Sequence, residues 1–95
     1  MVHLDITDPE KFKEYLAANG VPLKKYGAHF LARAGRFQHP EGGGRSRNTI
    51  IEFPSFDAAL ECWKSEEYQY AISLRKEASS IDITIVEGYD GPQLA

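Results

Sequence analysis

The order of the strand-like and helix-like segments is the feature that most restricts the fold of this chain. Residues 2–6 alternate apolar and polar side chains, the period-two pattern of a half-buried strand. Strand-like segments follow at 28–37, 47–53 and 81–86, and apolar residues at helical spacing lie in the two regions between 9–26 and 56–75. The order is therefore β-α-β-β-α-β, which predicts a fold well and a reaction poorly.

Helix boundaries are marked by residues that cap helices. Asp8 and Ser55 have the chemistry of N-caps, and Ser65 is a third such residue, followed by two glutamates that suit the first turn of a helix. We therefore expect the later helical region to be two short helices that are broken just before Ser65. In the first region Gly20 can cap a helix and Pro22 can restart one, so we expect that region to be kinked or broken near Pro22.

Length and composition limit the possible classes of function. A chain of 95 residues is expected to form one domain, 1–95. At this size only about 60–65% of the unfolded surface can be buried, which favours further burial against a second copy. The net charge of −3 argues against binding nucleic acid, because such binding depends on clustered lysine and arginine at phosphates.

Cysteine and histidine usage argues against a metal site. A single cysteine, Cys62, rules out an internal disulfide and a cysteine-cluster zinc site. The three histidines, His3, His29 and His39, are not at metal-ligand spacing. The sequence has no apolar run of 18 residues and no signal-peptide pattern at its start, so we expect a soluble, cytoplasmic protein with no membrane contact.

Two βαβ halves in this order predict an α+β subunit with a ferredoxin-like arrangement. Its four-stranded antiparallel sheet would carry both helical regions on one face, leaving the second face open. The strands carry apolar residues on both faces, so we expect an open apolar face, which a small protein must cover. The simplest cover is the same face of a second copy, which predicts a homodimer.

Several short motifs, none of them specific alone, together resemble one known family. They are Asp8-Pro9-Glu10 with Tyr15, the run 26–35 (YGAHFLARAG), the run 51–55 (IEFPS), and Trp63 with the run 65–68 (SEEY). From about residue 4 to residue 88 the chain resembles the family called domain of unknown function 1330, which belongs to the dimeric α/β-barrel proteins. Members commonly have several more strand residues before the position of Leu4.

The resemblance implies a ferredoxin-like subunit whose sheet pairs with another to close a barrel. It implies no established reaction, because the activity of the family is uncharacterised. Distant relatives on this fold include cofactor-free monooxygenases, heme-degrading enzymes and muconolactone isomerase. Their likeness is an analogy of fold, which does not carry a function to this chain.

A group of polar residues on the predicted strands is the first candidate site. It comprises Asp5, His29, Arg33 and Glu52. If the hairpin between the second and third strands closes symmetrically near residues 41–42, Leu31 faces Glu52. Arg33 and Glu52 are then diagonal neighbours, roughly 7 Å apart.

This group has two interpretations. In the first, a buried polar cluster binds a small anion or carbonyl substrate, with Arg33 as the donor and Glu52 or His29 as the general base. In the second, Arg33 and Glu52 form an ion pair that only fixes the register of the sheet or of a dimer. A lone histidine such as His29 is usually a hydrogen-bonded or partly exposed residue rather than a catalytic one.

Aromatic residues on the later helical region are the second candidate site. Trp63 ends one apolar stripe and Tyr68 begins the next, which continues through Ala71 and Ile72 to Arg75. Trp63 and Tyr68 are expected to flank the helix break and to form a wall over a ligand cleft between helices and sheet. The alternative is that both simply pack in the core.

Two functions remain open from the sequence. The first is a homodimeric subunit that binds or transforms a small organic molecule, without a cofactor, at Trp63 and Tyr68 and some of the polar residues Asp5, His29, Arg33 and Glu52. The second is a non-catalytic dimeric structural or ligand-sensing module in which those polar residues set the assembly.

Overall fold

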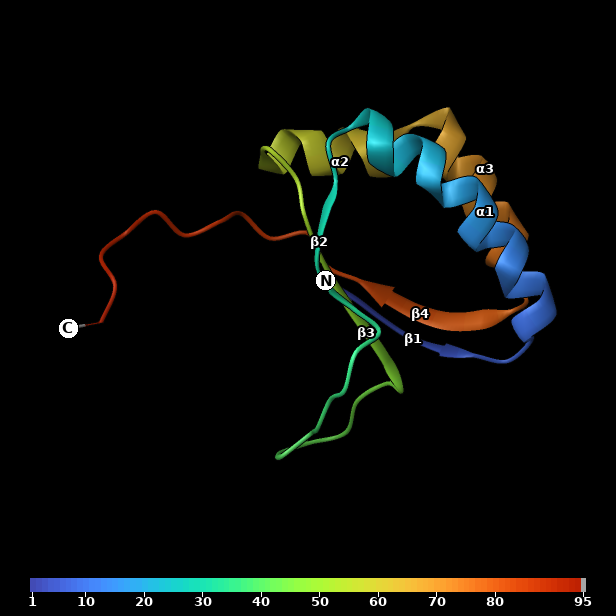
Figure 1. The fold of residues 1–95 in the computed structure, drawn as a ribbon, viewed down its shortest axis with the longest axis horizontal. Helices are drawn as coiled ribbons and strands as arrows, with labels where there is room; N and C mark the ends of the chain where they lie inside the picture. Colours follow the sequence, from blue (N-terminus) through green and yellow to red (C-terminus); the bar gives the residue numbers. More distant parts are fainter. Residues whose placement is uncertain (95) are drawn as a thin grey trace.

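The computed structural model describes residues 1–94 and has the predicted order of elements, with the later helical region divided in two (Figure 1). The elements are β1 (Val2–Ile6), α1 (Pro9–Lys25), β2 (His29–Arg33), β3 (Arg47–Glu52), α2 (Phe56–Lys64), α3 (Glu66–Arg75) and β4 (Ser79–Ile83). The four strands form one sheet in the order β2-β3-β1-β4, with every neighbouring pair antiparallel. The fold is therefore α+β, and the three helices lie on one side of the sheet (Figure 1).

The three predicted helix caps are confirmed. The Asp8 side chain accepts a hydrogen bond from the backbone N–H of residue 11 at 3.2 Å. The Ser55 and Ser65 hydroxyls accept from backbone N–H groups three residues later, at 3.0 and 3.2 Å. The Ser65 hydroxyl also donates to the Cys62 carbonyl at 2.7 Å, which closes the end of α2 while it starts α3. The predicted break before Ser65 is thus present.

The predicted break near Pro22 is wrong, because α1 continues through Gly20 and Pro22 to Lys25. Pro22 lies close to the end of the helix, and its ring is fully buried, so packing offsets the one hydrogen bond that its missing N–H costs. The last turn is closed by the Tyr26 N–H, which donates to the Pro22 carbonyl at 3.1 Å. Gly27, with φ of 78°, takes the left-handed position after the helix, and Gly20 does not cap it.

The register of the β2–β3 hairpin also differs from the prediction. Arg33 pairs with Thr49 instead of Ile50, and Glu52 pairs with His29 instead of Leu31, with a bulge between Phe30 and Ala32 that separates the two pairs. The strand then ends at Arg33, since the next residue has φ of 50°. One extra residue in one strand shifts the pairing of everything beyond it, so the hairpin does not close symmetrically. The strand β4 likewise begins and ends earlier than predicted, at Ser79 and Ile83.

This register separates two residues that we expected to be neighbours. Side chains alternate between the faces of a sheet, so Thr49 and Glu52, three positions apart on β3, point to opposite faces. Thr49 is buried under the helices, and Arg33, its partner, shares that face. Arg33 and Glu52 are therefore not diagonal neighbours, and they form no ion pair.

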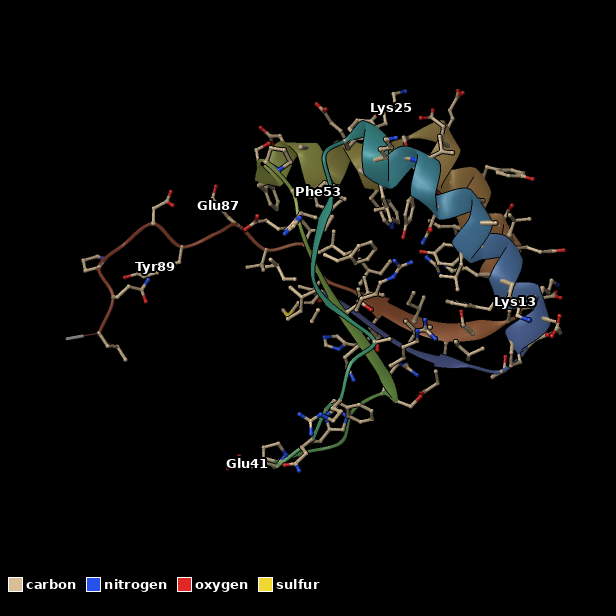
Figure 2. The ribbon with its side chains drawn as sticks, in the orientation of Figure 1. Lys13, Lys25, Glu41, Phe53, Glu87 and Tyr89 are labelled. Carbon is tan, nitrogen blue, oxygen red and sulfur yellow. The ribbon has the colours of Figure 1, made fainter. Side chains whose placement is uncertain are left out.

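The hydrophobic core lies between the sheet and the three helices. Its buried side chains come from every layer and are Leu4, Phe12, Tyr15, Leu23, Cys62, Tyr68, Ala71 and Ala78. Figure 2 shows side chains filling this space, with Phe53 at the point where the chain leaves β3 for α2. The core thus holds one face of the sheet against the helices.

The other face of the sheet is mostly polar, so the expectation of an open apolar face is wrong. His3 Nδ1 and Asn48 Oδ1 lie 2.6 Å apart there. Arg45, from the loop after β2, donates to Asp5 at 3.1 Å and to Asp82 at 2.8 Å, and so links β1 and β4. Ile50, which alternates with the helix-facing residues of β3, is a partly exposed apolar residue on this face.

After β4, residues 84–86 stay beside the sheet and line the space next to it, and the rest of the tail, up to residue 94, extends away from the molecule (Figure 1). Glu87 and Tyr89 lie on this tail (Figure 2). Its apolar residues Val86, Tyr89 and Leu94 are largely exposed. None of the helices formed within residues 1–94 has the length and apolar character needed to cross a membrane.

Candidate functional site

A cavity of about 290 Å³ opens between α2, the start of α3 and the adjoining ends of β3 and β4. Its walls are mainly apolar, and they include Phe53, Phe56, Cys62, Trp63, Tyr68 and Ile83. Trp63 is 39% exposed although it lines this cavity, so its ring lies at the edge of the core. An apolar hollow with a few polar groups is the usual form of a small-molecule site.

The break between α2 and α3 places the two aromatic side chains. Ser65 ends one helix and caps the next, and its hydroxyl binds the backbone N–H of Tyr68. The side chain of Gln69 donates to the Trp63 carbonyl at 2.6 Å, which bridges the break. Trp63 and Tyr68 therefore flank the cavity from either side of a fixed turn, where the sequence placed them.

Two tyrosine hydroxyls are paired beneath the cavity. The Tyr15 and Tyr68 oxygens lie 2.6 Å apart, and their rings meet edge to face. Burial raises the pKa of Tyr68, and the adjacent Tyr15 raises it further, so the hydroxyl stays protonated at neutral pH. One proton of the pair forms the shared bond. Within residues 1–94 the other has no acceptor, so it is available to a ligand oxygen.

Arg75 is a buried cation beside this pair. It is only 6% exposed, and its guanidinium carbon lies 5.1 Å from the centre of the Tyr15 ring. Its Nε atom is buried without a hydrogen-bond partner. The positive charge of Arg75 opposes the effect of burial on the pKa of Tyr68. The site thus combines two hydroxyls with one positive charge.

A smaller lobe of about 50 Å³ lies on the α1 side of the same space. Tyr68 lines both this lobe and the main cavity, and Arg33 and Arg47 line the lobe where β2 and β3 meet α1. The guanidinium of Arg33 lies 4.4 Å from the centre of the Phe30 ring. Arg33 is exposed and Arg47 half-buried, so water solvates both charges.

The structure brings together only part of the predicted site. Glu52 lines the main cavity together with Trp63 and Tyr68, and Arg33 lies in the smaller lobe. His29 is exposed and lies opposite Glu52 in the β2–β3 ladder.

Asp5 lies on the polar face of the sheet, away from the cavity. Hydrogen bonds from the backbone and hydroxyl of Ser46, with a smaller contribution from Arg45, lower the pKa of this carboxyl. Asp5 is therefore an ionised anchor for the loop after β2. Its surroundings are those of a structural carboxylate rather than of a general base.

Two residues of the site carried no role in the sequence prediction, Tyr15 and Arg75. Both were visible on apolar stripes of their helices, Tyr15 beside Phe12 and Arg75 seven positions after Tyr68. Arg75 could have been identified from the sequence, because it continues a stripe of residues that face the core. Charged residues are rarely buried without a partner, so an arginine at such a position suggests a role. Among residues 1–94, no group of three or more His, Cys, Asp or Glu side chains is arranged to hold a metal ion.

Comparison with known proteins bears on the family but not on the reaction. No curated protein matches the chain. The family model described as "Domain of unknown function (DUF1330)" matches residues 1–89. That match spans nearly the whole chain and includes every helix and strand of the structure. The chain belongs to the DUF1330 family.

Proposed function

We propose that this protein binds or transforms a small organic molecule, without a cofactor, in the cleft between helices and sheet. The observation that carries the proposal is the apolar cavity of about 290 Å³ beneath Trp63 and Tyr68. Its volume is near the lower end of the range for ligand pockets, about 300 Å³. A molecule of one ring or a short branched chain fits that space.

The polar groups at this cavity suit acid–base chemistry on a carbonyl compound. The free proton of the Tyr15–Tyr68 pair would donate to a carbonyl oxygen. Glu52 lines the cavity, but its side chain alternates onto the uncovered face of the sheet, so it would act as a base only from the rim. Arg33 would act from the neighbouring lobe. Asp5 and His29 are left out of the chemistry, because neither lines the cavity.

We also propose that the subunit is ferredoxin-like and pairs with a second copy to close a dimeric α/β barrel. The strand order β2-β3-β1-β4 and the position of all three helices on one side support the ferredoxin-like arrangement. The uncovered sheet face, with the partly exposed Ile50 among polar groups, is the surface that a second copy would cover. A reducing compartment such as the cytoplasm suits the free thiol of Cys62.

The dimer is tested by sedimentation. Analytical ultracentrifugation at micromolar concentration is expected to give the mass of a dimer. Ala32→Lys, which places a charge on the uncovered face beside Ile50, should shift the equilibrium to monomer, whereas Val21→Lys on the exposed side of α1 should not. A wild-type monomer at that concentration contradicts the dimer.

The cavity is tested with the single tryptophan of the chain, Trp63, as a fluorescence reporter. The probes are 2-phenylethanol, phenylacetate and phenethylamine, which share one ring and one short chain. Ala59→Phe fills the cavity wall and should abolish binding, whereas Ala58→Phe, one residue earlier and outside the lining, should preserve it. If no probe binds, or if the two variants bind alike, the cavity is not the ligand site.

A non-catalytic dimeric structural or ligand-sensing module is the second candidate. It is favoured by the bridge that Arg45 makes between Asp5 and Asp82, because such a link across the sheet serves assembly rather than chemistry. A probe that binds and is recovered unchanged after long incubation, by mass spectrometry, supports this candidate over catalysis.

A further inference from the structure

The charge of Arg75 has no counterion within the structure. Five ion pairs join the described residues, and Arg75 belongs to none of them. Arg75 is only 6% exposed to solvent, and its Nε atom makes no hydrogen bond. A buried charge is costly unless it is paired or hydrogen-bonded.

The Tyr15 ring compensates for only part of this cost. A cation over an aromatic ring is attracted to it, but more weakly than to a paired anion. The guanidinium of Arg75 has five N–H donors in a planar fork that matches a carboxylate, and the ring face satisfies none of them as a hydrogen bond. The residue therefore has unused capacity to bind an anion.

Arg75 faces a hollow that continues the main cavity. The hollow, about 420 Å³ and open to one side, is lined by Arg75 with Trp63, Ile81, Ile83 and Ile85. Trp63, Ile83 and Ile85 also line the main cavity, so the two spaces adjoin along β4 and the start of the tail. A molecule could thus place its apolar body beneath Trp63 and a charged end at Arg75.

We propose that the cleft selects small organic monoanions, carboxylates with an apolar body, and that Arg75 binds the carboxylate. This inference rests on the proposed function, because it names the class of ligand for the same cleft. A single cation in apolar surroundings matches one negative charge, whereas a phosphate dianion would leave a second charge buried and unpaired. Arg33 and Arg47 are poorer candidates, since water solvates them and their lobe is only about 50 Å³.

The experiment compares three probes that differ in charge and little in shape. Phenylacetate, 2-phenylethanol and phenethylamine are titrated into the full chain at neutral pH, with Trp63 fluorescence as the readout and calorimetry as confirmation. Phenylacetate is expected to bind at least about tenfold more tightly than the alcohol, and the amine more weakly than either. If the alcohol binds as tightly as phenylacetate, the anion preference is wrong while the cavity stands. If none binds, the proposed function fails as well.

Variants then test whether Arg75 is the group responsible. Arg75→Met keeps much of the length of the side chain and removes its charge. The affinity for phenylacetate should therefore fall about tenfold, and the affinity for 2-phenylethanol should not change. Arg75→Lys should restore part of the preference. Arg36→Met, in the exposed loop after β2, is the matched control and should behave as wild type.

Two results overturn the assignment to Arg75. The first is a phenylacetate preference that survives in Arg75→Met. The second is a preference that is lost in Arg33→Met, which would place the anion in the smaller lobe. If Arg75→Met does not fold, Arg75→Lys and Arg33→Met still decide between the two arginines. If the phenylacetate preference is weaker than wild type in Arg75→Lys and unchanged in Arg33→Met, the carboxylate binds at Arg75. An unchanged preference in Arg75→Lys contradicts that assignment.

Discussion

Replacing Tyr68 by phenylalanine tests the buried hydroxyl pair that underlies the site. Tyr15 and Tyr68 are 5% and 6% exposed, and their oxygens lie 2.6 Å apart with no other partner among residues 1–94. Tyr68→Phe removes one oxygen and leaves the Tyr15 hydroxyl buried and unpaired. An unsatisfied buried hydroxyl costs about 1–3 kcal/mol, so we expect the free energy of unfolding to fall by that amount.

The double variant separates the hydrogen bond from other effects. Tyr15→Phe should cost about as much as Tyr68→Phe, for the same reason. With both hydroxyls removed, no polar group is left unpaired and the two rings still meet edge to face, so the double loss should be smaller than the sum of the single losses. The difference is expected to be about 0.5–3 kcal/mol, the usual coupling energy of residues in contact.

The measurement is urea unfolding, with the melting temperature as a second readout. All variants are compared at one protein concentration, because self-association would make the apparent stability depend on it. In a domain of this size a loss of 1 kcal/mol corresponds to about 4–8 °C. Tyr70→Phe, on the exposed side of α3, is the control and should change stability by less than about 0.5 kcal/mol. The reasoning is refuted if Tyr68→Phe matches this control, or if the double variant equals the sum.

Three further predictions concern other parts of the molecule. Gly27 and Gly42 both have positive φ, but a Cβ at Gly27 would approach Pro54, at 3.0 Å, and a Cβ at Gly42 would meet nothing. Gly27→Ala should therefore lower the stability to urea more than Gly42→Ala, and equal losses would contradict this. Burial raises the pKa of Cys62 to about 11, so iodoacetamide at neutral pH should label the unfolded chain faster than the native one; fast native labelling would show an accessible thiol. The pKa of the Asp5 carboxyl is lowered from its usual 3.8, so its stabilising contribution is present above that pH and is lost as the pH falls through the folded value. The difference in stability between wild type and Asp5→Asn should therefore shrink in acid, and a constant difference would contradict this.

Local chemistry explains which parts of the fold the sequence predicted. A cap depends on one side chain and the N–H groups of the next turn, so Asp8, Ser55 and Ser65 could be identified from their neighbours. The continuity of α1 through Pro22 depends instead on burial of the proline ring against distant residues, which overrides its local preference for a break. The bulge in β2 is likewise invisible locally, because the long loop that follows sets how the strands align.

The same distinction applies to the candidate site. The helix break that separates Trp63 from Tyr68 was predicted correctly because it depends on local residues. The pairing of Arg33 with Glu52 was wrong because one bulge residue moves the two side chains to opposite faces. The stripe on α3 indicates only that Arg75 can face the core; that its charge is buried without a partner follows from the packing of α3 on α1 and the sheet.

The position of β1 in the sheet has a consequence for how the chain folds during synthesis. Of the four strands, β1 is made before the others, yet its two neighbours are β3 and β4, and the Met1 amino group donates to the Thr84 carbonyl across 83 positions. The sheet therefore cannot be completed while the last strand is still inside the ribosome. Contacts between such distant segments slow folding. A nascent chain would expose one edge of β1 until β4 has emerged.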